Sequence, residues 1–86
     1  LDHDQADPRL RLLRKNWFQD KKCLDIGCNN GKVTREIARR LEPDHIVGVD
    51  IDPELIATAN HVLQRAKIQR ADENPARFPI SFSIKY

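Results

Sequence analysis

The stretch Cys23-Leu24-Asp25-Ile26-Gly27-Cys28-Asn29-Asn30-Gly31 determines the fold of this chain. It begins with a short apolar run, typical of a buried strand, and ends in small residues that favour a turn. A helical pattern follows at once, so the sequence predicts a strand over residues 22–26, a tight loop, and a helix over residues 31–41. Glycine permits positive φ and close approach of a ligand to the backbone, and the helix N-terminus directs N–H groups at the loop. This combination is a cradle for a nucleotide or a carboxylate.

A second strand and a second helix follow in the chain. Ile46-Val47-Gly48-Val49 is apolar on both faces, which is typical of a buried parallel strand, and Asp50 stands at its carboxyl end. Asp52-Pro53-Glu54 is a helix-start signature, and apolar residues at three- and four-residue steps predict an amphipathic helix over residues 53–68. Alternation of apolar and polar residues predicts a half-buried strand over residues 80–84.

The N-terminal segment predicts one further helix. Asp7-Pro8 supplies an N-cap and a first-turn proline, and Leu10, Leu13 and Trp17 follow at helical spacing. We expect Trp17 and Phe18 to end this helix and to pack against the sheet edge, in preference to stacking on bases.

The order of elements predicts an α/β fold. A strand, a short helical crossover and a second strand must run parallel with a right-handed connection, which is the first half of a doubly wound sheet. The chain of 86 residues is long enough for one small domain but cannot complete a sheet of about six or seven strands. We therefore expect residues 1–86 to be a fragment, the N-terminal cofactor-binding part of a single domain.

The amino-acid composition excludes few classes of function. The net charge of +2 does not by itself argue for nucleic acid, but ten of the fifteen Lys and Arg residues fall in the first forty positions and predict a basic surface there. Cys23 and Cys28 lack a zinc-ligand spacing, and we expect no metal site; a free thiol pair suits a reducing compartment. We expect Cys23 to be buried in its strand and Cys28 to lie near the ligand. No run of about 18 apolar residues predicts a membrane span.

Two phosphate-binding motifs fit the loop poorly. A P-loop requires four residues between its glycines and a hydroxyl after the lysine, whereas Gly27 and Gly31 enclose three residues and Val33 follows Lys32. The dinucleotide fingerprint requires a third glycine at the position of Lys32, where the helix must approach the strand closely.

A third ligand, S-adenosylmethionine, fits better. The pattern Asp25-x-Gly27-x-Asn29-x-Gly31 is similar to motif I of class I methyltransferases, with Asn in place of the middle glycine. Asp50 can accept both ribose hydroxyls, and Ile51 offers an apolar face to adenine. The glycines could instead serve only a tight turn and Asp50 could cap the next helix, although Asp52 already fills that role. We expect Asp25 to order N–H groups of the loop.

Longer stretches carry a closer resemblance. Residues 7–13, Trp17-Phe18, residues 23–29 and Val47-Gly48-Val49-Asp50-Ile51-Asp52 occur in an order and at gaps that resemble the Bicoid-interacting RNA methyltransferase family, closest to its branch that caps 7SK small nuclear RNA. The resemblance covers roughly residues 7–66. It implies a Rossmann-like class I methyltransferase fold, S-adenosyl-L-methionine as cofactor, and methylation of the 5′ terminal (gamma) phosphate of a small nuclear RNA.

The resemblance also implies residue roles. Arg9 would contact the cofactor carboxylate, Gly27 and Asn29 would form the cofactor loop, and Asp50 and Ile51 would hold ribose and adenine. Methyl transfer is an in-line displacement whose rate depends mainly on positioning, and a phosphate acceptor is already anionic, so no general base is required and we identify no catalytic residue. The family's acceptor motifs have no counterpart in this chain.

The implied partners are an RNA 5′ end and a La-related RNA-binding protein, in the nucleus or alternatively the cytoplasm, with no membrane. Arg11, Arg14 and Lys15 are candidates for RNA backbone contact. Two alternatives remain open: a class I methyltransferase acting on a small molecule or a protein, and a non-catalytic RNA- or protein-binding module on the same fold. We expect the isolated chain to be inactive because half of the sheet is absent.

Overall fold

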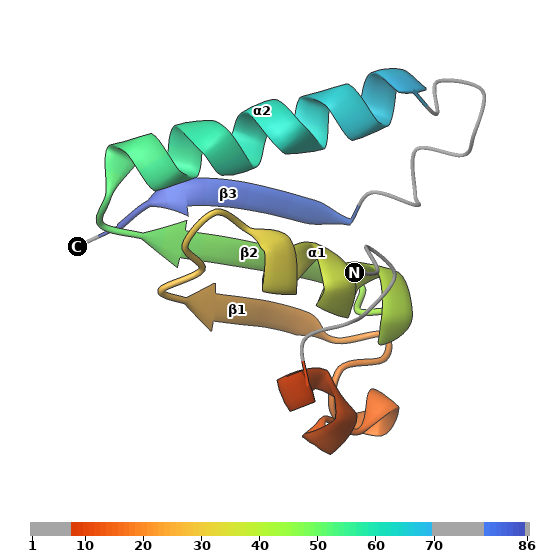
Figure 1. Cartoon of the computed structure of the whole chain (residues 1–86). Coiled ribbons are helices and arrows are strands. Elements are labelled where there is room, and N and C mark those ends of the chain that lie inside the picture. The colour runs from red at the N-terminus through yellow and green to blue at the C-terminus, as the bar shows by residue number, and fades with distance from the viewer. Residues whose placement is uncertain (1–7, 70–78, 86) are drawn as a thin grey trace.

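Three parallel strands in the order β1-β2-β3 form the sheet of the computed structural model, which describes residues 8–69 and 79–85. In chain order the elements are the 3-10 helices η1 (Pro8–Leu12) and η2 (Lys15–Trp17), then β1 (Lys22–Ile26), α1 (Lys32–Arg40), β2 (His45–Asp50), α2 (Pro53–Gln69) and β3 (Ile80–Ile84). Figure 1 shows α1 lying across the sheet and α2 running alongside β3.

The strand register shows which residues meet at the carboxyl-terminal edge of the sheet. β1 pairs with β2 from Lys22↔His45 to Ile26↔Val49, and β2 pairs with β3 up to Asp50↔Ile84. Because all three strands run in one direction, their carboxyl ends meet at a single edge, and the loop after β1 lies there beside Asp50. This is the predicted α/β arrangement, and the fold class is confirmed.

Both helices cover one face of the sheet, as two successive right-handed crossovers in the same direction require. The cluster of buried apolar residues joins the helices to alternate strand positions. Its members are Leu10, Cys28, Ile37, Ile46, Ile56, Ala59, Leu63, Ile80 and Phe82. On the opposite face Leu24 and Ile26 are 62% and 78% exposed, so β1 presents large apolar side chains there.

The ring of Phe82 explains two of the glycines. A Cβ added at Gly48 would lie 2.8 Å from Cδ1 and Cε1 of Phe82, and one added at Gly31 would lie 2.5 Å from Cζ. Neither position leaves room for a side chain while this ring is in place. The closeness of Gly31 to β3 therefore fixes where α1 begins above the sheet.

The predicted boundaries are close to the observed ones. The strands over residues 22–26 and 80–84 are confirmed. The second strand, predicted over residues 46–49, also includes one residue at each end, His45 and Asp50. The second helix extends to Gln69, and Asp52 caps it by accepting the N–H of Glu54 at 2.9 Å. Most of the predicted polar loop, at residues 70–78, lies outside the described residues.

The single N-terminal helix was a wrong prediction. Residues 8–17 form η1 and η2, separated at Arg14 by extended backbone with φ −97° and ψ 135°. Only Leu10 is buried in this stretch, and so short a helix needs a packed face to persist. Phe18 packs against the core, but Trp17 is 52% exposed, so the expected packing of Trp17 is also wrong. Asp7, the predicted cap, lies outside the described residues.

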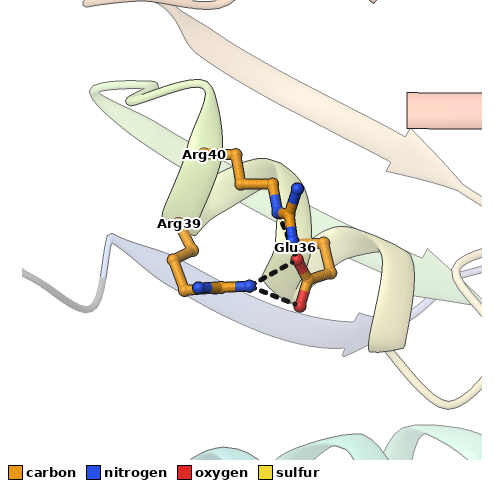
Figure 2. Close-up of polar contacts among 3 residues, drawn as sticks. All are labelled: Glu36, Arg39 and Arg40. Carbon is orange, nitrogen blue, oxygen red and sulfur yellow. Dashed lines mark hydrogen bonds and ion pairs between the residues drawn. The ribbon is translucent and has the colours of Figure 1, made fainter. Parts of the chain in front are cut away.

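Basic residues on α1 are held by an acidic neighbour (Figure 2). Glu36 accepts hydrogen bonds from Arg39 Nη2 at 2.9 and 3.2 Å and from Arg40 Nε at 2.7 Å. Partial burial raises the pKa of Glu36, but the bonds and charges of the two arginines outweigh it and hold the pKa below its ordinary value of 4.5. No helix among the described residues is long and apolar enough to cross a membrane.

Candidate cofactor site at the carboxyl ends of the strands

The loop after β1 is held in a conformation that few side chains tolerate. Gly27, Asn29 and Gly31 have φ of 71°, 53° and 84°. Glycine adopts positive φ without strain, and Asn tolerates it better than most residues. The N–H of Gly31 donates to the carbonyl of Cys28 at 3.0 Å, which closes the turn. The alternation of glycine and asparagine in the sequence is thus explained by the backbone.

Asp50 joins this loop to the next one. Its Oδ2 accepts the N–H of Asn29 at 3.0 Å, and its Oδ1 accepts the N–H of Asp52 at 3.0 Å. These bonds, first that from Asp52 and then that from Asn29, hold the pKa of Asp50 below its ordinary value of 3.8. The carboxylate is therefore ionised at neutral pH. Each oxygen retains a second lone pair with which it can accept a ligand hydroxyl.

Cys28 lies in the loop, as expected, but its side chain packs into the core. It is 6% exposed, and its N–H donates to the carbonyl of Val49 at 2.9 Å, a second link between loop and β2. Burial, followed by the charges of Asp25 and Asp50, raises the pKa of the thiol above 9.0. A protonated, buried thiol is a poor nucleophile, so Cys28 has a packing role. Cys23, expected to be buried, is half-buried.

Asp25 has a partner that the sequence did not predict. Its Oδ2 accepts a hydrogen bond from Thr34 Oγ1 at 2.5 Å, where loop N–H groups were expected. Thr34 is fully buried in the first turn of α1. The spacing of Thr34, Ile37 and Leu41 at three and four residues could have placed Thr34 on the inner face. Asn30 was also missed, although its Oδ1 accepts the N–H of Lys32 at 3.1 Å at the helix start.

The structure brings together most of the predicted site residues. Gly27 and Asn29 lie in the loop, Asp50 bonds to Asn29, and Ile51 follows Asp50 with 64% of its side chain exposed. Arg9 is an exposed residue of η1, which Figure 1 shows near the start of β1, whereas the loop follows its end. The contribution of Arg9 to cofactor binding stays a prediction.

This arrangement fits an adenosyl group. A Cβ at Gly27 would meet nothing within 4 Å, so there is open space over the loop backbone at that position. The ionised Asp50 is a two-oxygen acceptor for vicinal hydroxyls, and the exposed Ile51 is an apolar surface for a base. Among the described residues, no group of three or more His, Cys, Asp or Glu could hold a metal ion.

Comparison with known proteins agrees with this chemistry. A model for a methyltransferase domain matches residues 23–83. A probable RNA methyltransferase of Arabidopsis thaliana is 49% identical over 59 residues, 69% of this chain and 19% of that protein. The mouse 7SK snRNA methylphosphate capping enzyme is 51% identical over 53 residues, 62% of this chain and 8% of that protein. The U6 snRNA methylphosphate capping enzyme of Drosophila melanogaster is 41% identical over 69 residues, 78% of this chain and 23% of that protein.

Solved structures share the fold. Phosphoethanolamine N-methyltransferase 1 of Haemonchus contortus, solved with phosphoethanolamine and S-adenosylhomocysteine, superposes with a TM-score of 0.60 at 19% identity. The match covers 91% of this chain and 14% of that one. The chain thus spans less than a quarter of the length of the curated relatives named above.

Proposed function

Because this chain belongs to the methyltransferase domain family, whose cofactor is S-adenosylmethionine, we propose that it is part of an RNA methyltransferase acting on the 5′ terminal (gamma) phosphate of a small nuclear RNA. One observation carries this proposal. Two relatives named as snRNA methylphosphate capping enzymes are 41% and 51% identical to this chain over aligned stretches of 69 and 53 residues, against 19% for a solved methyltransferase that shares the fold.

The residues of the site divide the work of holding the cofactor. Asp50 accepts the ribose hydroxyls, Ile51 packs on the adenine, and the loop from Gly27 through Asn29 lets the backbone approach the nucleoside. For Arg9 the family resemblance is the only support, because η1 lies near the start of β1, and we propose on that basis that it pairs with the cofactor carboxylate. Bound there, S-adenosylmethionine supplies an electrophilic methyl group for in-line transfer.

The acceptor chemistry requires little of this chain. A terminal phosphate is anionic before the reaction, so it needs orientation and no base to remove a proton. Arg11 and Arg14 are exposed and are two of the three predicted RNA-contact candidates in this chain. Lys15, the third predicted candidate, forms an ion pair with Glu42 at 3.0 Å, which ties η2 to the turn before β2. Its part in RNA binding is therefore the weakest of the three.

We also propose which part of the methyltransferase domain this chain forms, and where in the cell and with which partners the protein acts. We assign residues 1–86 to the N-terminal cofactor-binding part of one methyltransferase domain; the small share of its curated relatives that the chain spans, between 8% and 23%, supports this assignment. The isolated chain is then inactive, and turnover by residues 1–86 alone would contradict this assignment. The names of the capping relatives support a nuclear location and an RNA 5′ end as partner. A La-related RNA-binding protein is the partner protein we propose from family resemblance.

A methylation assay on the complete domain tests the function. Radiolabelled S-adenosylmethionine is offered with 7SK and U6 transcripts bearing a 5′ triphosphate, with the same transcripts bearing a 5′ hydroxyl, and with a panel of metabolites and proteins. We expect label only in the triphosphate RNAs, retained after phosphomonoesterase treatment, because the methyl group blocks the terminal phosphate, and released by a pyrophosphatase that cleaves the 5′ phosphoanhydride bonds. Label in a base, a metabolite or a protein would show that the terminal phosphate is not the acceptor. RNA binding without any methyl transfer would favour a non-catalytic module.

A further inference from the structure

The contact between Thr34 and Asp25 links the two elements that flank the cofactor loop. Thr34 is the buried polar side chain in the described part of the chain, with 0% of its surface exposed. Its hydroxyl lies 2.5 Å from Oδ2 of Asp25, a half-buried residue of β1. Valine has nearly the same shape as threonine, so packing alone does not explain a hydroxyl at this position.

The two residues stand on either side of the loop. Asp25 lies two residues before Gly27, and Thr34 lies three residues after Gly31 in the first turn of α1. A bond between them fixes the end of β1 relative to the start of α1, and with it the two ends of residues 27–31. Three of those five residues need positive φ, a conformation that persists only if the surrounding structure holds it.

The pair completes a set of three anchors on one loop. The middle of the loop is held by Asp50 at the N–H of Asn29, and its inner side by Val49 at the N–H of Cys28. Both of these tie the loop to β2, whereas the bond from Thr34 to Asp25 ties α1 to β1. Hydrogen bonds to ionised groups are about twice as strong as neutral ones, and the N-terminal end of a helix favours a nearby carboxylate.

From this geometry we infer that Asp25 and Thr34 are positioning residues for the cofactor loop: they preset its shape for the adenosyl group without touching it. The inference rests on the proposal that this loop binds S-adenosylmethionine. Losing the bond leaves the fold in place but lets the loop sample other conformations, and only the fraction in the binding shape contributes to affinity.

The experiment measures binding of S-adenosylhomocysteine to the complete domain by isothermal titration, with thermal unfolding alongside. Thr34→Val removes the hydroxyl at constant shape and Asp25→Asn removes the charge; Thr34→Ser keeps the hydroxyl. Thr58→Val, at an exposed position of α2, is the matched control. We expect Thr34→Val and Asp25→Asn to weaken binding about tenfold, or about 1.4 kcal/mol, with the double variant no weaker than either single one. Thr34→Ser and Thr58→Val should bind as the unsubstituted domain does.

A purely structural role gives a different result. If Thr34→Val lowers the unfolding temperature while its folded form binds S-adenosylhomocysteine unchanged, the inference is overturned. If Thr34→Val does not fold, Asp25→Asn, which keeps the size of the side chain, decides in the same way. If the unsubstituted domain does not bind the nucleoside, the assignment of the site fails, and amide hydrogen exchange over residues 27–31 still tests the pair. Exchange no faster in Thr34→Val than in Thr58→Val would refute the positioning role.

Discussion

Gly31→Ala perturbs the point where the cofactor loop, α1 and β3 meet. The added Cβ would lie 2.5 Å from Cζ and 2.8 Å from Cε1 of Phe82, and 3.0 Å from Cβ of Ala59. The backbone φ of 84° is also strained for any residue with a Cβ. Gly27 is a matched control, because it has a similar φ of 71° but nothing within 4 Å of an added Cβ.

The expected magnitude follows from two separate costs. Left-handed backbone costs alanine about 1–2 kcal/mol, and forcing an extra methyl group into a packed core costs about 1–3 kcal/mol. The stiffer unfolded chain returns about 0.4–1 kcal/mol. We therefore expect Gly31→Ala to lower the free energy of unfolding by about 1–4.5 kcal/mol, and Gly27→Ala by at most about 1.5 kcal/mol, so that the packing cost separates the two variants by about 1–3 kcal/mol.

Urea unfolding of the complete domain measures both values. A third variant locates the clash: leucine at position 82 lacks the ring atoms that the new Cβ would meet, so Phe82→Leu should reduce the cost of Gly31→Ala measured in that background. Equal losses for Gly31→Ala and Gly27→Ala, or a cost of Gly31→Ala that is unchanged by Phe82→Leu, would refute the packing argument and leave only backbone strain.

Three further predictions concern charge. Asp50→Ala should weaken binding of S-adenosylhomocysteine at least about tenfold by titration calorimetry, and Asp44→Ala, at the opposite end of β2, should not; equal effects would contradict the site. The pKa of Asp50 is lowered in the folded state, so its contribution to folding stability is fully present above the unfolded value of 3.8 and is lost as pH falls through the folded value. The carboxylate that accepts the ribose hydroxyls is therefore ionised throughout the range above that value. Binding should thus be constant between about pH 8 and about pH 5, and a tenfold fall over that range would argue against Asp50 as the acceptor. Glu36→Gln should lower the free energy of unfolding by only about 0.4–1 kcal/mol, because the side chains of its partners Arg39 and Arg40 are 60% and 41% exposed; a loss well above that would show a core role.

The main elements were predictable because their signals are local. The apolar runs at the strands, the Asp52-Pro53 start of α2 and the Gly-Asn alternation of the loop each depend on residues close together in the chain. Parallel pairing then follows from the short helical crossover. The edge formed by Asn29 and Asp50 could be predicted in the same way, since carboxyl ends of adjacent parallel strands meet.

The parts that were missed depend on contacts between distant residues. The N-terminal stretch shows helical spacing, but too few of its apolar side chains reach the core, and it breaks at Arg14. The orientation of Cys28 toward the core and the bond from Thr34 to Asp25 need the helix placed over the sheet before they can be seen. The ring of Phe82, which is distant in the sequence, occupies the space that a side chain at Gly31 or Gly48 would need.

A crystal structure of the complete domain with S-adenosylhomocysteine tests the account most directly. We predict the adenosyl group over Gly27 and Asn29, with both ribose hydroxyls within hydrogen-bond distance of the Asp50 carboxylate and the adenine against Ile51. The nucleoside bound elsewhere, or Asp50 making no contact with the ribose, would contradict it.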